Sequence, residues 1–573
     1  MAMSQRLSFP VGTREEVHSA RGVVSAGHPL AVQAGLDALD RGGNAIDAVI
    51  AGAFAAFVAE PNNAGIGGYG HLSAFLARDR GGAEFLTVDH GPRAPARATA
   101  DMFEVLGADP DGHDWPAVAG NRNYVGQLAV AVPGAVAGLW AAHQEAGRLQ
   151  WGSLLATAID TAESGLEVAW VLLQEIVARA AEIEARPALA RILMPEGRLP
   201  RARTADAEGE RLDQRELAAT LRLIATHGPD AFYRGPVAEA IAADIAACGG
   251  ILSADDLAAY TPRVVRERPQ SYRGLRYVTA VDPVGYEVLG ILERFPIAEL
   301  GAGSPGHYHL LAEALAHAFA DNATYASDPD FTDDPVAELG DPEFAAARAR
   351  AISVDRAAPR PIVPSAPWLD SSSPPRPPSA GGVHGTTQVV AADADGNLAS
   401  LITTIGADFG SLVAVPGTGI VLNNSMINYD PRPGRSNSIA PGKMPFFAVP
   451  AVVAARDGRP AFAAAGSGGY AILTGVISTM VGVVDHGLGV QAAIDAPRVH
   501  SQGNRTFIDA RVPAEVREHL TNLGHELVVQ AVTPGELPFS RVSAVAVDPK
   551  RLDGEGWLAA GAGPSWNTAA GGL

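Results

Sequence analysis

Residues 386–424 read TTQVVAADADGNLASLITTIGADFGSLVAVPGTGIVLNN, and the prediction of the fold begins from this stretch. Two runs of β-branched and apolar residues, Thr386 to Ala392 and Leu398 to Ile405, are typical of strands. Asp395-Gly396 between them is a common hairpin turn. A third short run, Gly419 to Leu422, follows. The stretch therefore predicts a β-hairpin that opens a strand-rich C-terminal part.

The sequence on either side predicts both helices and strands. Pro359 to Ala380, just upstream, holds eight Pro and five Ser and predicts an extended linker. The residues from about Trp151 to Arg350 are mostly helical in pattern. The other predicted elements are helices at Pro29 to Leu39, after the cap Asn44 and at Gly475 to Val484, and strands at His71 to Ala77, Ala448 to Ala455 and Ala461 to Ala465. This mixture indicates an α+β protein.

Composition excludes several classes of function. The net charge of −20 over 573 residues disfavours a nucleic-acid partner, because phosphate backbones would be repelled. One cysteine, Cys248, excludes an intramolecular disulfide. The most apolar run, Ala45 to Ala59, is shorter than a membrane span and contains Asp47. We expect a soluble, cytoplasmic protein without a secretory signal and without a membrane partner.

Common cofactor motifs are missing. The sequence contains no HExxH, CxxC or GxxxxGK[ST] motif, and its histidines lack ligand spacing. The one GxGxxG match, Gly65 to Gly70, is expected to run into a strand instead of a helix. We therefore expect neither a metal nor any other cofactor.

The junction His384-Gly385-Thr386-Thr387 places a threonine at the start of the predicted hairpin, after the linker. A threonine hydroxyl is a weak nucleophile unless a base lies beside it. If Thr386 became an N-terminus, its own α-amine, with a pKa near 8, would supply that base. Cleavage at Gly385-Thr386 would create this terminus. Taken alone, the pattern also fits ordinary strand propensity.

The surrounding blocks resemble the γ-glutamyltranspeptidase family of N-terminal nucleophile hydrolases, which cut themselves. The resemblance spans nearly the whole chain and includes the hairpin quoted above, GGNAIDAVIAGAFA, EPNNAGIGGYGHL, VPGAVAGLW, GGILSADDLAAY and AAGSGGYAILTGV. It implies a four-layer αββα sandwich. It also implies a large chain of residues 1–385 and a small catalytic chain of residues 386–573, associated as a heterodimer that could pair further into a larger assembly.

The family's catalytic residues match positions of this sequence. Thr386 matches the nucleophile, and Thr404 matches a second threonine that supports its activation. Gly468 and Gly469 match the pair whose backbone N–H groups form the oxyanion hole. The resemblance therefore implies hydrolysis of a small-molecule amide through an ester on Thr386.

The family's clamp for the glutamyl carboxylate is altered. An arginine position is occupied by Gly91, while Arg93 lies two residues later, where a strand would keep it on the same face. The serine pair that completes the clamp matches Phe446 and Phe447.

The ammonium side of the clamp is altered too. Gly406, Ser425 and Asn428 stand where the family has Asn, Gln and Asp. Asn428 cannot compensate a buried positive charge. We therefore expect the chemistry to be retained and the acyl group to differ from a standard γ-glutamyl.

Three alternatives remain open. The chain could be a true γ-glutamyl hydrolase or transferase that binds its donor through Arg93. Relatives in pyrroline antibiotic pathways suggest a second alternative, hydrolysis of a carbon–carbon bond. The third is an uncut, inactive scaffold, which the retained Thr386 and Thr404 argue against.

Overall fold

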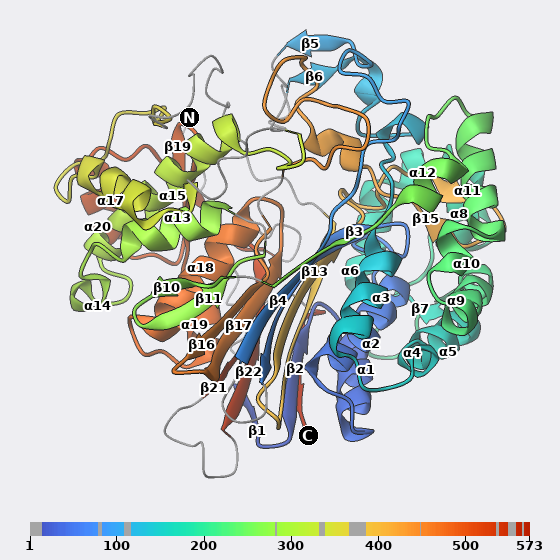
Figure 1. The fold of residues 1–573 in the computed structure, drawn as a ribbon, viewed down its shortest axis with the longest axis horizontal. Coiled ribbons are helices and arrows are strands. Elements are labelled where there is room, and N and C mark those ends of the chain that lie inside the picture. The colour runs from blue at the N-terminus through green and yellow to red at the C-terminus, as the bar shows by residue number, and fades with distance from the viewer. Residues whose placement is uncertain are drawn as a thin grey trace.

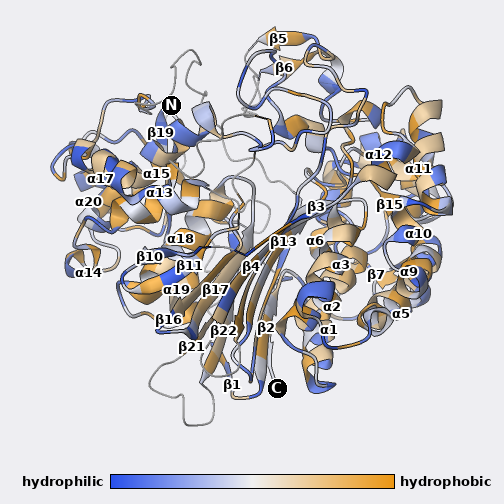
Figure 2. Cartoon of the chain, viewed as in Figure 1, coloured by the Kyte–Doolittle hydropathy of each residue, from blue (hydrophilic) through white to orange (hydrophobic). Residues whose placement is uncertain are grey.

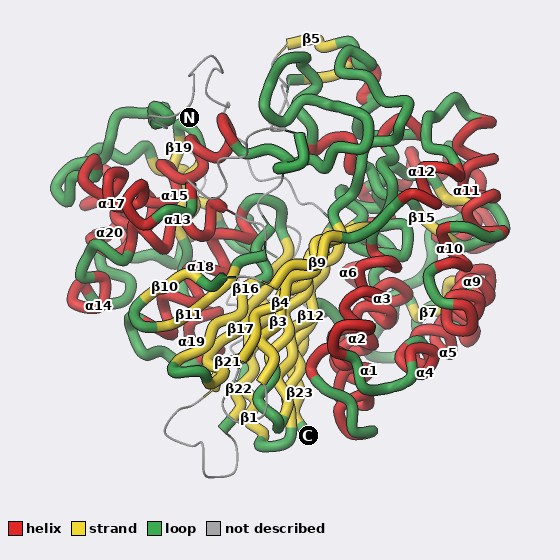
Figure 3. The backbone as a smooth tube through the Cα atoms, in the orientation of Figure 1, coloured by secondary structure: helices red, strands yellow, loops and turns green. Residues whose placement is uncertain are grey.

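The computed structural model describes residues 14–77, 83–107, 116–266, 268–280, 283–331, 339–365, 385–446, 449–533, 538–547, 557–563 and 567–573. Two seven-stranded antiparallel sheets lie face to face at its centre, and helices cover both outer faces (Figure 1, Figure 3). The predicted αββα sandwich is confirmed. No helix of the described part is long and apolar enough to span a bilayer.

The first sheet contains the predicted hairpin near its middle. Its order is β23 (Ala569–Gly572), β2 (Gly22–Ala26), β12 (Thr386–Asp393), β13 (Leu398–Thr404), β3 (Tyr69–Ala77), β4 (Ala83–His90) and β9 (Arg263–Arg266). Helices α1 (Pro29–Asp40), α2 (Ala45–Ala59) and α3 (Ala135–Ala146) pack on its outer face. All fifteen residues of α2 are buried, because α1, α5 (Ala156–Ser164) and α3 cover the sides that the sheet does not.

The second sheet has the order β1 (Val17–Ser19), β22 (Leu558–Ala562), β21 (Arg541–Val547), β17 (Arg459–Ser467), β16 (Val452–Arg456), β11 (Leu275–Val278) and β10 (Gln270–Tyr272). Helices α18 (Ala471–Val484) and α19 (Val490–Asp495) pack directly on this sheet. Helices α13 (Pro283–Leu292), α15 (Pro305–Tyr325), α17 (Pro342–Ala351) and α20 (Ala514–Asn522) form a further helical cluster on that side (Figure 1).

The other described elements surround these layers. Short strands are β5 (Val105–Gly107), β6 (Ala117–Val118), β7 (Leu166–Glu167), β8 (Arg211–Leu212), β14 (Ala414–Val415), β15 (Ile420–Val421), β18 (Val499–Gln502), β19 (Arg505–Asp509) and β20 (Leu527–Gln530). Helices are α4 (Trp151–Leu154), α6 (Trp170–Ala178), α7 (Ala180–Glu184), α8 (Pro187–Leu193), α9 (Arg215–His227), α10 (Asp230–Tyr233), α11 (Pro236–Ala247), α12 (Ala254–Ala259), α14 (Ile297–Leu300) and the 3₁₀ turns Ala119–Asn121, Gln127–Ala129, Pro195–Gly197 and Ser425–Asn428.

Strand β12 is buried on both faces, and its side chains alternate between two apolar clusters. Val389 and Ala391 contribute to the cluster under α1 and α2. Val390 and Ala392 contribute to the cluster between the sheets and under α18. Figure 2 shows mostly hydrophobic residues along the central strands. This continuous apolar run therefore fixes β12 in the middle of the sandwich.

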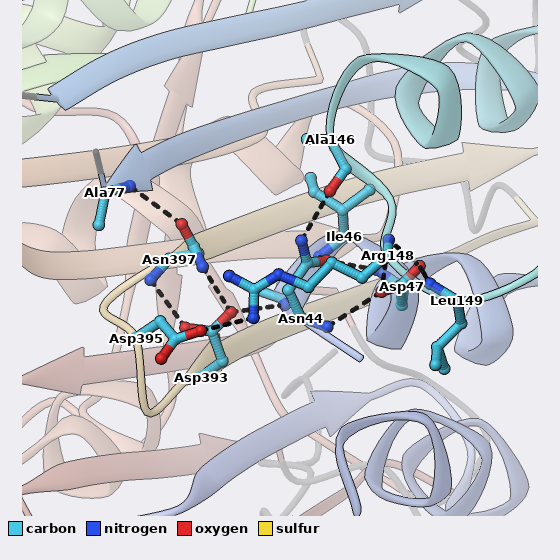
Figure 4. Close-up of polar contacts among 11 residues, drawn as sticks. Asn44, Ile46, Asp47, Ala77, Ala146, Arg148, Leu149, Asp393, Asp395 and Asn397 are labelled. Carbon is cyan, nitrogen blue, oxygen red and sulfur yellow. Dashed lines mark hydrogen bonds and ion pairs between the residues drawn. The ribbon is translucent and has the colours of Figure 1, made fainter. Parts of the chain in front are cut away.

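A polar network fixes the end of the hairpin that lies away from Thr386 (Figure 4). Asp393 accepts hydrogen bonds from the Ala45 backbone N–H (2.9 Å) and the Asn397 side chain (2.8 Å). Asn397 in turn accepts one from the Ala77 backbone N–H (3.0 Å). The network therefore ties β12 and β13 to the start of α2 and the end of β3.

Most of the predicted elements are confirmed, with small shifts of their ends. The helix expected after Asn44 begins with a capping box of Asn44 and Asp47. The strand expected from Ala448 begins only at Val452. Of the expected linker, residues 366–380 lie outside the described residues. Its first part is held by carboxylates of α15: Arg360 pairs with Glu313 at 2.8 Å.

Candidate active site

Three side chains of the first sheet meet at one end of its strands. Thr386 begins β12 and pairs with Thr404 at the end of β13, which pairs with Tyr69 at the start of β3. Direct cross-strand neighbours point to the same face of a sheet. Two residues along β12, Gln388 shares that face and donates to Ser543 of the second sheet (3.2 Å). The three side chains therefore point toward the second sheet.

A hydrogen-bond relay joins Thr386 to the peptide bond that precedes it. The Thr386 hydroxyl donates to Thr404 Oγ1 at 3.1 Å, and the Thr404 hydroxyl donates to the carbonyl oxygen of Gly385. The backbone N–H of Gly406 donates to Thr404 Oγ1 at 2.8 Å and holds this hydroxyl in place. Such an arrangement can polarise the Gly385 carbonyl next to a hydroxyl nucleophile.

Gly385 lies in a space that admits no side chain. A Cβ at this position would lie 2.5 Å from the Asn62 carbonyl oxygen and 2.9 Å from that of Ala407. The same Asn62 carbonyl accepts a hydrogen bond from the Phe409 N–H (3.0 Å) and so holds the loop after β13. Glycine is therefore required here for close backbone approach.

The predicted oxyanion-hole glycines form a turn after β17. Gly468 and Gly469 have φ values of 127° and 61°, which favour glycine. Arg541 connects this turn to the nucleophile candidate, because it donates to Ser467 Oγ at 2.8 Å and to the Thr386 carbonyl at 3.3 Å. The sequence offered no signal for Arg541, which lies 155 residues from Thr386. The assignment of the two glycines to an oxyanion hole stays a prediction.

A pair of acidic side chains lies beside Arg541. Asp408, in the loop after β13, shares a hydrogen bond with Glu175 of α6. Burial, and then the charge of Glu175, raise the pKa of Asp408 to about 8. Burial raises the pKa of Glu175 too, although Arg541 and Arg179 oppose this. Sequence reasoning missed the pair because its partners come from distant elements.

Two of the predicted substrate residues hydrogen-bond to each other and to the site. The Asn428 side chain donates to Ser425 Oγ at 2.9 Å and to the Tyr69 hydroxyl at 3.0 Å. Tyr69 is the cross-strand neighbour of Thr404. Burial raises the pKa of Tyr69, so the hydroxyl stays neutral at ordinary pH. Tyr69 therefore links the side chains of Ser425 and Asn428 to the strand position next to Thr404.

Gly406, where the family has asparagine, has no room for a side chain. Its φ is 97°, and a Cβ would lie 2.0 Å from Asn424 Oδ1. That oxygen accepts a hydrogen bond from the Ala407 N–H at 2.9 Å. The Asn424 amide thus fills the space beside Gly406 and supports the loop that carries Asp408.

Arg93 does not lie on a strand, so the expectation of a same-face shift was wrong. Strand β4 ends at His90, and Pro92 cannot donate to a strand ladder. The Arg93 guanidinium donates to the Gly442 carbonyl at 3.0 Å. None of its hydrogen bonds among the described residues reaches Thr386 or Thr404.

Of the two predicted phenylalanines, only Phe446 lies in the described part of the chain. Phe446 is half-buried against the cluster between the sheets, and its N–H donates to Asn437 Oδ1 at 2.9 Å. Asn437 also donates to the Asn428 carbonyl at 2.8 Å. Phe446 is thus tied to the segment that carries Asn428, while Phe447 lies outside the described residues.

One cluster, formed by two residues of α15 and His525, has the side chains of a metal site. His309, Glu313 and His525 are buried, and their ligand atoms lie within 4.8 Å of one another. His309 Nδ1 and His525 Nε2 share a hydrogen bond of 2.8 Å, and the other His309 nitrogen bonds Ser353 O. The Arg360 side chain and the Ala358 N–H each donate a hydrogen bond to the Glu313 carboxylate. These polar atoms already satisfy one another, so the cluster has the features of a structural network.

Comparison with known proteins gives the family. The gamma-glutamyltranspeptidase family model matches residues 31–570. The acylase ACY 1 proenzyme of Pseudomonas sp. (strain SE83) is 38% identical over 524 residues, covering 90% of this chain and 88% of that protein. The glutathione hydrolase proenzyme of Pseudomonas sp. (strain A14) is 32% identical over 565 residues, covering 94% and 91%.

Among solved structures, the cephalosporin acylase from Bacillus halodurans superposes with a TM-score of 0.83 and 29% identity, covering 100% of this chain and 99% of that one. Family model, relatives and fold agree on an enzyme that hydrolyses amides. The chain belongs to the γ-glutamyltranspeptidase family and is an N-terminal nucleophile hydrolase.

Proposed function

We propose that this protein is a self-processing amide hydrolase whose nucleophile is Thr386. The observation that carries the proposal is the relay from the Thr386 hydroxyl through Thr404 to the Gly385 carbonyl. Relatives named as proenzymes support a precursor that is cleaved.

Maturation begins when the Thr386 hydroxyl oxygen bonds to the Gly385 carbonyl carbon and loses its proton. The carbon–nitrogen bond then breaks as the nitrogen takes up a proton, which leaves an ester between Gly385 and Thr386. Thr404 donates to the carbonyl oxygen on which negative charge develops. The amine of Thr386 is free once the carbon–nitrogen bond has broken, and water then cleaves the ester into a Gly385 carboxylate and the Thr386 hydroxyl.

Turnover repeats this chemistry on a substrate amide. The free amine accepts the hydroxyl proton, and the hydroxyl oxygen bonds to the substrate carbonyl carbon. The Gly468 and Gly469 N–H groups stabilise the oxyanion, and the protonated amine gives its proton to the leaving nitrogen. Water then hydrolyses the ester on Thr386 and frees the acid.

The two chains remain associated as a heterodimer after cleavage. The small chain's β12 and β13 lie between β2 and β3 of the large chain in one continuous sheet. Separation would break both of these ladders and expose apolar surface on both faces. Residues 1–385 and 386–573 therefore act as one folded unit.

The acyl group differs from a standard γ-glutamyl. Gly406 itself has no side-chain amide to hold an ammonium, and the Asn428 side chain donates to Ser425 Oγ. The Arg93 guanidinium donates to the Gly442 carbonyl, and none of its hydrogen bonds among the described residues reaches Thr386 or Thr404. Relatives named acylase and cephalosporin acylase support an acyl amide as substrate.

Paired chromogenic substrates test the proposal. Hydrolysis of butyryl, glutaryl and γ-glutamyl p-nitroanilides is compared on mature protein. We expect at least about 10-fold higher kcat/KM for one of the two acyl groups without the ammonium, because about 1.4 kcal/mol of transition-state binding changes a rate tenfold.

A preference for the γ-glutamyl anilide that Arg93→Ala abolishes would instead establish the glutamyl alternative. Thr386→Ala must remove all three activities, and retained activity would exclude Thr386 as nucleophile.

A further inference from the structure

The two halves of the proposed catalytic site lie on different sheets. Thr386 begins β12 of the first sheet, whereas Gly468 and Gly469 follow β17 of the second sheet. Strands β12 and β17 pack against each other through apolar side chains such as Val390 and Ala464. Apolar contact is non-directional, so it does not by itself fix the distance between the two halves precisely.

An oxyanion hole needs such precision. Its donors must lie about 2.7–3.1 Å from the oxyanion that develops on the substrate. A misplacement of about 1 Å can slow a reaction about 10²-fold. A polar connection between the sheets at this point would therefore contribute to turnover.

Arg541, the first residue of β21, makes this connection. Its Nε donates to Ser467 Oγ at 2.8 Å, and its Nη2 donates to the Thr386 carbonyl at 3.3 Å. Nε and Nη2 belong to one planar guanidinium, whose N–H groups form a rigid fork. Ser467 directly precedes Gly468. The guanidinium therefore holds the nucleophile residue and the start of the glycine turn at a fixed separation.

The glycine turn also packs on the chain that carries Arg541. Ser467 and Arg541 are cross-strand neighbours in the β17–β21 ladder. A Cβ on Gly468 would lie 3.1 Å from Ser540 Cα, so the turn closely approaches the residue before Arg541. The buried Arg498 donates to the Ser540 carbonyl and fixes this residue. The turn and the Arg541 backbone therefore form one unit, from which the Arg541 side chain reaches the first sheet.

Two acidic side chains face the Arg541 guanidinium. They are Glu175 of α6 and Asp408 of the loop after β13. Burial raises the pKa of both carboxyls, and the charge of Arg541 opposes this rise. The same attraction stabilises the guanidinium in its position between the sheets.

We infer that Arg541 is a positioning residue for turnover, whose bridge from Ser467 to Thr386 holds the predicted oxyanion hole at its working distance from the nucleophile. This role rests on the proposed function. In self-cleavage Arg541 has no corresponding role, because Thr404 donates to the Gly385 carbonyl on which charge develops. Loss of the bridge should therefore slow turnover and leave maturation nearly unchanged.

Arg541→Met tests this role, since it removes both bonds and keeps an unbranched side chain. Hydrolysis is measured on mature protein with whichever of the butyryl, glutaryl and γ-glutamyl p-nitroanilides the wild type hydrolyses fastest. We expect kcat to fall about 10²-fold and KM to change less than about 3-fold. Self-cleavage, followed as the fraction of cut chain over time, should stay within about 3-fold of the wild-type rate.

Two further variants separate the fork from the charge. Arg541→Lys keeps the positive charge that faces Glu175 and Asp408, but offers one ammonium in place of two N–H groups at fixed spacing. We expect its kcat to stay at least about 10-fold below that of the wild type. Ser467→Ala removes the other end of the bridge with little change of volume and should also lower kcat about 10-fold.

Ser400→Ala is the matched control. Ser400 of β13 donates to the Ala464 carbonyl of β17 at 2.8 Å, so it also connects the two sheets. Its cross-strand neighbour is Val390, four residues along β12 from Thr386. The kcat, KM and maturation rate of this variant should equal those of the wild type, and its thermal unfolding midpoint shows what loss of a bond between the sheets costs in stability.

Four results would overturn this role. They are a wild-type kcat in Arg541→Met or in Arg541→Lys, a wild-type kcat in Ser467→Ala, an equal fall of kcat in Ser400→Ala, and self-cleavage of Arg541→Met that slows as much as its turnover. Ser467→Ala decides if Arg541→Met does not fold.

Thr386→Ala keeps this test separate from that of the proposed function. If Thr386→Ala still hydrolyses the anilide, the proposed nucleophile is wrong. If Thr386→Ala is inactive while Arg541→Met keeps the wild-type kcat, the proposed function stands and the role of Arg541 is wrong.

Discussion

The Thr404 hydroxyl has two partners in the site, since it accepts from Thr386 and donates to the Gly385 carbonyl. Thr404→Val keeps the shape of the side chain but removes both bonds. Loss of one oxyanion donor typically slows a reaction about 10²- to 10³-fold. We expect maturation of this variant to slow by that factor, measured as the fraction of cut chain over time.

Thr404→Ser is the matched control, because it keeps the hydroxyl. It should cut within about 10-fold of the wild-type rate, as the loss of one methyl group mainly costs packing. Equal rates for Thr404→Val and the wild type would show that this hydroxyl does not take part.

Asp408 should make the stability of the folded chain depend on pH. Its pKa of about 8 in the folded chain lies above its ordinary value, so the folded state binds more protons than the unfolded state between about pH 4 and pH 8. The contribution of Asp408 to stability therefore falls as the pH rises through that window. Glu175, Arg179 and Arg541 are the charged groups that face it.

Asp408→Asn removes this titration and keeps the size of the side chain. Relative to wild type, the variant should gain stability from pH 5 to pH 8, measured as the difference in urea midpoint at each pH. A difference that does not change with pH would contradict the raised pKa.

At the scale of elements, the β12–β13 hairpin depends on the network at its far end. Asp393 is 4% exposed and accepts from Ala45 and Asn397 (Figure 4). Asp393→Ala leaves these donors unsatisfied, and we expect a loss of about 2–4 kcal/mol in the free energy of unfolding.

The neighbouring Asp395 provides the control for this variant. It pairs with Arg148 on the surface, where both side chains are about half exposed. Asp395→Ala should therefore cost less than about 1 kcal/mol. Equal losses in the two variants, measured by urea denaturation, would argue against the buried network.

The same hairpin illustrates what the sequence could predict. Its apolar runs and its Asp-Gly turn are local signals, so both strands are predicted almost to their ends. The capping box of Asn44 is also local. The strand that the sequence predicts at Arg93 does not form as part of β4, which ends at His90, because the ring of Pro92 removes a ladder donor.

Across the whole molecule, the candidate site combines segments that are distant in sequence. Glu175, Asp408 and Arg541 meet beside Thr386, yet no periodicity or short motif connects them. Family resemblance supplied Thr386 and Thr404, since those positions lie in recognisable blocks. It did not indicate a role for Arg541, or for Tyr69 in the block EPNNAGIGGYGHL, because the roles of both residues depend on register and packing in this chain.

We expect the folded precursor to cut itself between Gly385 and Thr386 and to remain one sandwich. Intact mass under denaturing conditions, on freshly purified wild type and on Thr386→Ala, tests this most directly. In proportion to 385 and 188 residues, the wild type should give species of about 40 and about 19 kDa, the smaller one beginning at Thr386. Thr386→Ala should remain at 59.1 kDa. A wild-type chain that stays whole on incubation, or a variant that is cut equally well, would contradict the proposed nucleophile.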